Sequence, residues 1–239
     1  TNLTGTGGSS FSNTKSIELD GIDAFVEVAD NSNLSFGNGT TDSPFSISAW
    51  VNMTDATRFR IVSKYDSNLE YLFATGGTDR IAFNCYDNST SARIGRQYST
   101  ALTSLQGTWI HLVATYDGST SSTGQKIYLN GSRVDDTNSN SGSYTAMENT
   151  TAPLEIGKLT TTRANGLIDE VAIFDVELSA SDVTNIYNSG IPNNLNDLST
   201  SPLSWWRFEG TGTTATDSGS GGNNGVLDNT VVRSTDVPT

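Results

Sequence analysis

The stretch Asn165–Val183, NGLIDEVAIFDVELSASDV, joins the pattern of a buried strand to the start of a helix. Its first half is a short apolar run with aromatic and β-branched residues, which is typical of a strand packed inside a fold. Ser179 and Asp182 then form the pattern of a capping box, which predicts a helix start. Asp169 and Glu170 interrupt the apolar run, so something must offset the cost of placing two carboxylates there.

Outside this stretch the chain reads as short strands separated by turns. Phe45–Met53, FSISAWVNM, alternates between two faces, and Asn130-Gly131 is a strong signal for a tight hairpin. One short helix is predicted near residues 180–188, and Pro192 prevents a longer one. We therefore predict an all-β fold, an antiparallel two-sheet jelly-roll sandwich with one short helix.

Composition narrows the classes of function. The 239 residues carry a formal net charge of −13, from 26 acidic and 13 basic side chains. That charge disfavours nucleic acid or an anionic membrane as a partner, since both would be repelled, and it is compatible with neutral sugars and divalent cations. No apolar segment approaches the roughly 20 residues of a membrane span, so no membrane insertion is expected. Cys85 is the single cysteine, which excludes an internal disulfide and a cysteine-based zinc site.

Five motifs, taken in order, resemble a known family. They lie within Ser16–Gly190 and read LDGIDAFVEV, FSISAWVNM, WIHLVATYDG, IYLNG and GLIDEVAIFDVELSASDV. This order is similar to that of LamG-like jelly-roll domains of the concanavalin A-like lectin/glucanase superfamily, to which pentraxins and laminin G modules are related. The resemblance implies the sandwich fold, but it says much less about activity because one fold hosts many functions.

The end of the chain carries a further piece of this pattern. LSWWRFEGTGTTATDSGSGGNNGVLDN, from Leu203 to Asn229, resembles the segment that usually opens a LamG-like domain, although in this chain it comes last. Either it begins a second repeat, or residues 203–236 fold back as the closing strand and loop of one domain spanning residues 1–239. We favour fold-back, because an unpaired apolar strand at a sheet edge invites aggregation. The ending is also similar to jelly-roll proteins of marine viruses and bacteria, which implies a virion or cell-surface setting.

Asp169 is the first candidate for a metal ligand. By strict alternation it shares a face with Val171 and Ile173, so we expect it to point toward the sandwich interior. Pure-β sandwiches of the resembled superfamily often hold calcium between an Asp near the last strand and the N-terminal strand. This resemblance implies three partners for Asp169, namely Asp20, Gly21 and Asp23. The alternative is that Asp169 only accepts hydrogen bonds from backbone amides or from Arg163.

A second calcium candidate is the loop of residues 217–225, DSGSGGNNG. Asp217, Asn223 and Asn224 offer oxygen ligands of the kind that Ca²⁺ prefers. The alternative is a flexible turn, for which the glycines alone suffice. Ca²⁺ is the one cofactor expected.

Catalysis is not expected. Retaining glucanases of the superfamily use acids that alternate along one strand, and the nearest approach is ELDGID, Glu18 to Asp23. This stretch ends in Asp and is interrupted by a turn, so it does not ensure the separation between two carboxyl groups that a retaining glucanase requires. His111 is the single histidine, and its apolar strand WIHLVATYD predicts an interior position.

Aromatic side chains beside polar ones are the candidates for sugar binding, because sugars stack on rings while their hydroxyls bond to polar groups. Trp50 lies on the polar face of its strand, and Trp205 shares a face with Arg207 in LSWWRFE. The full candidate set is Trp50, Tyr86, Tyr128, Trp205 and Arg207. The alternative is that Trp50 and Trp205 simply cover the second face of a sheet.

These observations predict a non-catalytic, calcium-stabilised, lectin-like module that attaches to cell-surface glycans or polysaccharides outside the cell. One alternative is a structural or protein-binding domain of a virion or surface assembly, with a protein partner. A second alternative is a polysaccharide-degrading enzyme that depends on Glu18 or Asp20.

Overall fold

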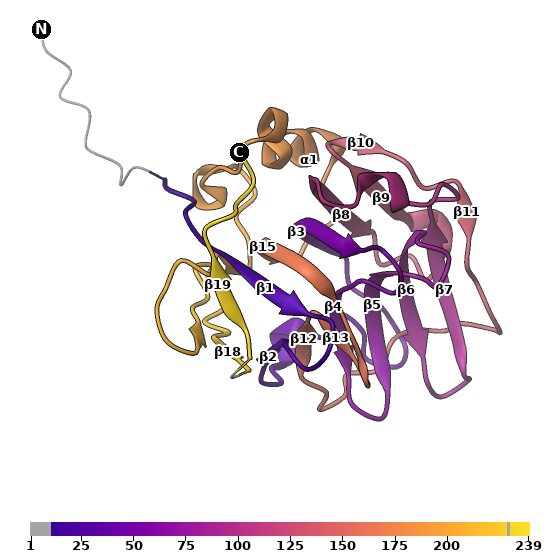
Figure 1. Cartoon of the computed structure of the whole chain (residues 1–239). Coiled ribbons are helices and arrows are strands. Elements are labelled where there is room, and N and C mark those ends of the chain that lie inside the picture. The colour runs from indigo at the N-terminus through magenta and orange to yellow at the C-terminus, as the bar shows by residue number, and fades with distance from the viewer. Residues whose placement is uncertain (1–10, 229) are drawn as a thin grey trace, which may run out of the picture.

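The computed structural model describes residues 11–228 and 230–239. Two large antiparallel sheets form a sandwich (Figure 1). The eight-stranded sheet, sheet A, has the order β10 (Ser132–Arg133), β9 (Gln125–Leu129), β8 (Trp109–Tyr116), β3 (Phe45–Asp55), β15 (Asn165–Phe174), β1 (Ser16–Asp20) and β19 (Val232–Ser234), with β16 (Ser204–Trp206) also paired to β15. The prediction of an all-β sandwich is confirmed.

The nine-stranded sheet, sheet B, lies on the other side of the core. Its order is β11 (Thr137–Asn138), β7 (Ala92–Gln97), β6 (Ile81–Asp87), β5 (Leu69–Thr75), β4 (Arg60–Tyr65), β12 (Leu154–Ile156), β2 (Val26–Val28), β18 (Gly225–Leu227) and β17 (Thr214–Ala215). A separate small hairpin joins β13 (Lys158–Leu159) to β14 (Thr162–Arg163).

The α-helix of the described residues, α1, spans Ala180–Tyr187, as predicted. Its capping box is formed: the Asp182 amide donates to Ser179 Oγ at 3.2 Å, and the Ser179 amide donates to Asp182 Oδ2 at 3.0 Å. Asn188 ends the helix with a left-handed φ of 46°. The described 3₁₀ turns are Ser32–Leu34, Thr103–Leu105, Ser122–Gly124, Asn188–Gly190 and Leu195–Asp197. No helix in the described ranges is both long and apolar enough to cross a membrane.

The main core fills the space between the sheets. Phe45 on β3 stacks on Phe36, with 4.2 Å between the ring centroids. Its ring centroid lies 5.0 Å from that of Tyr71 and 5.5 Å from that of Phe83, both on sheet B. A second apolar cluster lies on the outer face of sheet A, where α1 packs through Val183 and Ile186. At α1 the molecule therefore has three successive layers: the helix, sheet A and sheet B.

Residues 203–236, the closing segment, pair with both sheets. β16 lies beside β15, β18 beside β2, and β19 beside β1. Figure 1 shows β19 in yellow next to the indigo β1, so the first and last described strands are neighbours in sheet A. Trp206 is fully buried in the main core. The closing segment thus completes both faces of the sandwich.

Candidate functional site

The strand β15 contains a bulge next to Asp169. The register of β15 against β3 shifts between Asp169 and Ala172, so Ile168 and Val171 both reach the main core. Asp169 pairs with Trp50 and lies on the outer face of sheet A. The prediction that this carboxylate points into the sandwich was wrong, because the bulge breaks the alternation on which it rested.

Asp169 is nevertheless fully buried. Its Oδ2 accepts a hydrogen bond from Asn13 Nδ2 at 2.9 Å, and its Oδ1 accepts one from the Glu170 amide at 2.8 Å. Arg163 donates instead to backbone carbonyls such as that of Thr160. Burial raises the pKa of Asp169 well above its ordinary value, and the neighbouring Glu170 charge adds to this.

Glu170 occupies the bulge itself, with a left-handed φ of 50° that is unusual for a residue other than glycine. Trp205 Nε1 donates to Glu170 Oε2 at 2.5 Å, and Arg207 Nε lies 3.4 Å from Glu170 Oε1. Burial raises the pKa of Glu170 to about 7, against the opposing effect of Arg207. The two acids therefore form a buried pair with one cation in contact.

The first predicted calcium site is not assembled. In the register of β1 against β15, Asp20 lies opposite Asn165, four residues from Asp169 and so roughly 13 Å away along the strand. Asp20 Oδ1 accepts three backbone N–H groups, those of Ile22, Asp23 and Ala24, at 2.8–3.1 Å. This carboxylate stabilises the turn around Gly21, and burial is outweighed by these hydrogen bonds, which lower its pKa.

The second predicted calcium loop does bring its residues together, but around N–H donors. Asp217 Oδ1 accepts from the amides of Trp205 and Gly219, and Asp217 Oδ2 accepts from the amide of Asn223 at 2.7 Å. The Asn223 side chain is buried and bonds to Asn31, Asn33 and Ser204. Asn224 Oδ1 accepts from the Asp217 amide at 2.9 Å. These oxygens organise the loop, so the residues present do not fit a calcium ion.

Across residues 11–228 and 230–239, no group of three or more His, Cys, Asp or Glu side chains is arranged to hold a metal. We predict that adding calcium after chelation leaves the thermal unfolding temperature unchanged, because the carboxylates of Asp20 and Asp217 already accept backbone N–H groups in the native state. Thermal melts followed by circular dichroism, with magnesium as a control for general ionic effects, check this. A calcium-specific rise in the melting temperature would contradict it.

Three of the predicted sugar-binding aromatics are buried. Trp50 and Tyr128 are 4% exposed and Trp205 is 1% exposed, so none offers a ring face to a ligand. Trp50 stacks on Tyr187 of α1, and Trp205 stacks on Phe11. Their assignment to ligand binding is corrected: all three lie in the covered outer face of sheet A, which was the alternative interpretation for Trp50 and Trp205.

Arg207 also serves the fold in this structure. Its guanidinium lies 4.5 Å from the Phe11 ring and 4.9 Å from the Trp205 ring, and Nη2 donates to the Ser12 carbonyl at 2.6 Å. Together with the ion pair to Glu170, these contacts fasten residues 11–13 over the buried acids.

His111 lies in the same outer layer of sheet A and is fully buried. Its Nε2 is 2.8 Å from Ser48 Oγ, and its ring packs 4.9 Å from that of Trp50. Burial lowers the pKa of His111 to about 3, so the ring is neutral at ordinary pH. The predicted interior position is what the structure shows.

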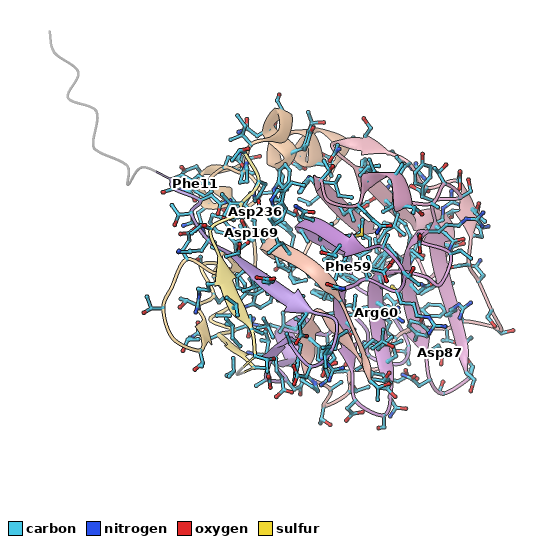
Figure 2. All side chains as sticks on the ribbon, viewed as in Figure 1. Phe11, Phe59, Arg60, Asp87, Asp169 and Asp236 are labelled. Atoms are coloured by element: carbon cyan, nitrogen blue, oxygen red, sulfur yellow. The ribbon has the colours of Figure 1, made fainter. Side chains whose placement is uncertain are left out.

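The remaining candidate, Tyr86, lies on the outer face of sheet B. It is half-buried and pairs across the strands with Arg93 on β7. Both residues line a depression of about 320 Å³ at the tip of the β6–β7 hairpin, together with Asn68, Asp87, Asn88 and Ser91. In Figure 2, Arg60 and Asp87 lie over the sheet B side of the molecule, whereas Phe11, Asp169 and Asp236 gather at the other end.

The depression is lined by both neutral and charged hydrogen-bonding groups. Burial raises the pKa of the Tyr86 hydroxyl, which therefore remains a neutral donor. Although burial works the other way, hydrogen bonds from Ser89, Thr145 and Thr90 lower the pKa of Asp87 to about 2. The wall thus combines an aromatic ring, a cation, an anion and amides, which is the mixture that orients sugar hydroxyls.

The sequence interpretation missed Arg93 and Arg60, which lie on the same outer face. The signal was present in CYDNSTSAR, because a turn at residues 88–91 sets Tyr86 opposite Arg93. Recognising it requires knowing which face of β6 looks outward, and that follows only from the burial of Phe83 and Cys85 in the main core.

A comparison of the sequence with models of known families defines the class of this protein. The chain belongs to the concanavalin A-like lectin/glucanase superfamily, whose family model matches residues 20–184. A comparison with curated proteins gave no match.

Solved structures show the same fold at low sequence identity. A protein of Bacteroides ovatus, named for an inferred carbohydrate-binding role, is 18% identical with a TM-score of 0.63 over 95% of this chain and 62% of that one. This chain therefore spans less than two thirds of that protein. The heptameric SAP-like pentraxin of Limulus polyphemus is 11% identical with a TM-score of 0.55, covering 92% and 94% of the two chains. The botulinum neurotoxin serotype D binding domain is 14% identical with a TM-score of 0.50, covering 73% and 42%. None of these comparisons tests whether the protein belongs to a virion, so that setting stays a prediction.

Proposed function

We propose that this protein is a non-catalytic carbohydrate-binding module that uses the outer face of sheet B. The observation that carries the proposal is the half-buried ring of Tyr86, placed beside Arg93 at the depression lined by amides and hydroxyls. A ring of this kind supplies an apolar platform for a sugar, while the surrounding groups fix its hydroxyls. The superfamily membership supports the proposal, as does the name of the Bacteroides ovatus protein. We further propose that the ligand is a cell-surface or extracellular glycan.

We predict that Tyr86→Ala weakens polysaccharide binding about tenfold, the factor that corresponds to ~1.4 kcal/mol of lost stacking. Tyr86→Phe keeps the ring, so it should retain most of the affinity. Affinity electrophoresis against a panel of soluble neutral and acidic polysaccharides, followed by calorimetry on the best ligand, measures the effect. Binding by the wild type that Tyr86→Ala leaves untouched would place the site elsewhere, and absence of binding to the whole panel would refute the function.

A further inference from the structure

Two arginines on the outer face of sheet B have no carboxylate partner. Among the described residues, neither Arg60 on β4 nor Arg93 on β7 lies within 4.0 Å of a carboxylate oxygen, whereas six other basic side chains do, namely Lys64, Arg96, Lys126, Arg133, Lys158 and Arg207. The chain has twice as many acidic as basic residues, 26 against 13. In such a chain, cations left without an acid on one sheet face are available to an external anion.

Each of these arginines is held in place by one backbone carbonyl. Arg93 Nε donates to the Ser139 carbonyl at 2.9 Å, and Arg60 Nη1 donates to the Thr75 carbonyl at 3.3 Å. A guanidinium has five N–H donors, so each retains donors for a ligand. Arg60 Nε has no hydrogen-bond partner among the described residues. Burial lowers the pKa of Arg60, and so does the nearby Arg58; an anionic ligand would offset the repulsion between the two guanidinium groups.

Small residues lie beside Arg60 on this face, and the row between the two arginines contains Leu72 and Asn84. Arg60 pairs with Ala74, Ala74 with Ala82, and Gly95 on β7 lies opposite Asn84. A Cβ at Gly95 would come within 2.1 Å of Asn84 Oδ1 and 2.2 Å of Ser139 Oγ, so these two side chains cover the backbone at Gly95.

The two arginines are far enough apart for an oligosaccharide. They lie three strands and about four residues apart on one face, so a strand spacing of about 4.8 Å and a rise of about 3.3 Å place their Cα atoms roughly 20 Å from each other. Tyr86 lies next to Arg93 along this diagonal. The arrangement is cation, aromatic ring, cation.

We propose that the glycan bound on this face carries carboxylates, as uronic acid residues do, and that Arg93 and Arg60 bind them. The inference rests on the proposed function and adds the chemical class of the ligand. Arginine binds carboxylates through paired, charge-assisted hydrogen bonds, which are stronger than bonds to neutral hydroxyls. The net charge of −13 opposes a densely charged polyanion, but screening beyond about 8 Å leaves short-range contacts to individual carboxylates favourable.

The test compares oligogalacturonate with the same oligosaccharide after its carboxylates are reduced to neutral alcohols. Wild-type protein is expected to prefer the acidic form at least tenfold by calorimetry, with the preference falling as salt is raised. Arg93→Gln is expected to abolish most of that preference while neutral binding persists. Arg163→Gln removes the same charge from the β14 strand, where Arg163 also has no carboxylate within 4.0 Å in the described structure, and should leave the preference intact.

The possible outcomes separate the two proposals. Equal affinity for the acidic and neutral forms would overturn the carboxylate inference and leave the carbohydrate-binding function standing. Equal loss of preference in Arg93→Gln and Arg163→Gln would also overturn it, because the effect would then be one of net charge. Binding to neither form, nor to any neutral polysaccharide, would overturn both.

Discussion

Trp206→Ala is expected to lower the free energy of unfolding by about 3–5 kcal/mol, the range for truncating a large buried aromatic side chain. Trp206 is fully buried in the main core although it belongs to the closing segment. Its Nε1 donates to the Asn223 carbonyl at 2.8 Å, so the variant also loses a buried hydrogen bond. On β16 the residue pairs with Val171 of β15. Urea unfolding followed by far-ultraviolet circular dichroism measures the loss.

Trp109→Ala is the matched control. Trp109 is only half-buried at the start of β8, and its Nε1 donates to Asp236 Oδ1 at 2.8 Å. Its truncation should cost under about 2 kcal/mol, as expected for a partly exposed side chain with one polar contact. If both variants lost the same small amount, the closing segment would not be an integral part of the core.

The sandwich was predictable because its signals are local. Phe45–Met53 alternates along β3, and that alternation survives in the fold because residues 45–52 pair with β8 without a register shift. The helix was predictable for the same reason, since Ser179 and Asp182 satisfy the capping box without help from distant residues.

The direction of Asp169 was not predictable, because a single extra residue at a bulge reverses every later side chain on the strand. Nothing in IDEVAIF marks Glu170 as left-handed. For a related reason, the sequence did not predict the burial of Trp50 and Trp205. A polar strand face suggests solvent, but residues 11–13 and α1 cover this face through contacts that span most of the chain.

The two predicted calcium sites are not assembled in this structure, because one sequence pattern is compatible with two local structures. An Asp before a glycine-containing turn can supply a carboxylate oxygen to a metal ion. The same oxygen can instead accept hydrogen bonds from the backbone N–H groups of the turn. Asp20 and Asp217 both take the second course. Only the positions of the amide hydrogens distinguish the two, and these depend on the turn geometry.

The buried pair Asp169 and Glu170 predicts a pH-dependent stability with a definite sign. Ordinary carboxyl pKa values lie near 4 in the unfolded chain, whereas Glu170 titrates at about 7 in the folded protein and the pKa of Asp169 is also raised. Between about pH 4 and pH 7 the folded state therefore binds more protons than the unfolded state. This contribution to the free energy of unfolding is complete below pH 4 and is lost as the pH rises through 7.

Asp169→Asn is expected to be about 2 kcal/mol more stable than the wild type at pH 8, and to show a flatter pH dependence. The amide oxygen still accepts from the Glu170 backbone. The new amide group can donate to Asn13 Oδ1, which is buried and has no partner within the described residues, once the Asn13 amide turns over. The substitution thus keeps the hydrogen bonds and removes a buried charge. Urea unfolding at pH 5 and pH 8 provides the comparison.

Asp175→Asn is the matched control, because it removes the same charge from an exposed position just beyond the end of β15. Its stability should follow that of the wild type at both pH values, since substitutions of exposed side chains usually change the free energy of unfolding by no more than about 0.5 kcal/mol. A loss of stability in Asp169→Asn at pH 8 would mean that the fold needs the negative charge itself. A bound cation would then be the natural partner of Asp169, and the bulge of β15 would be a metal site after all.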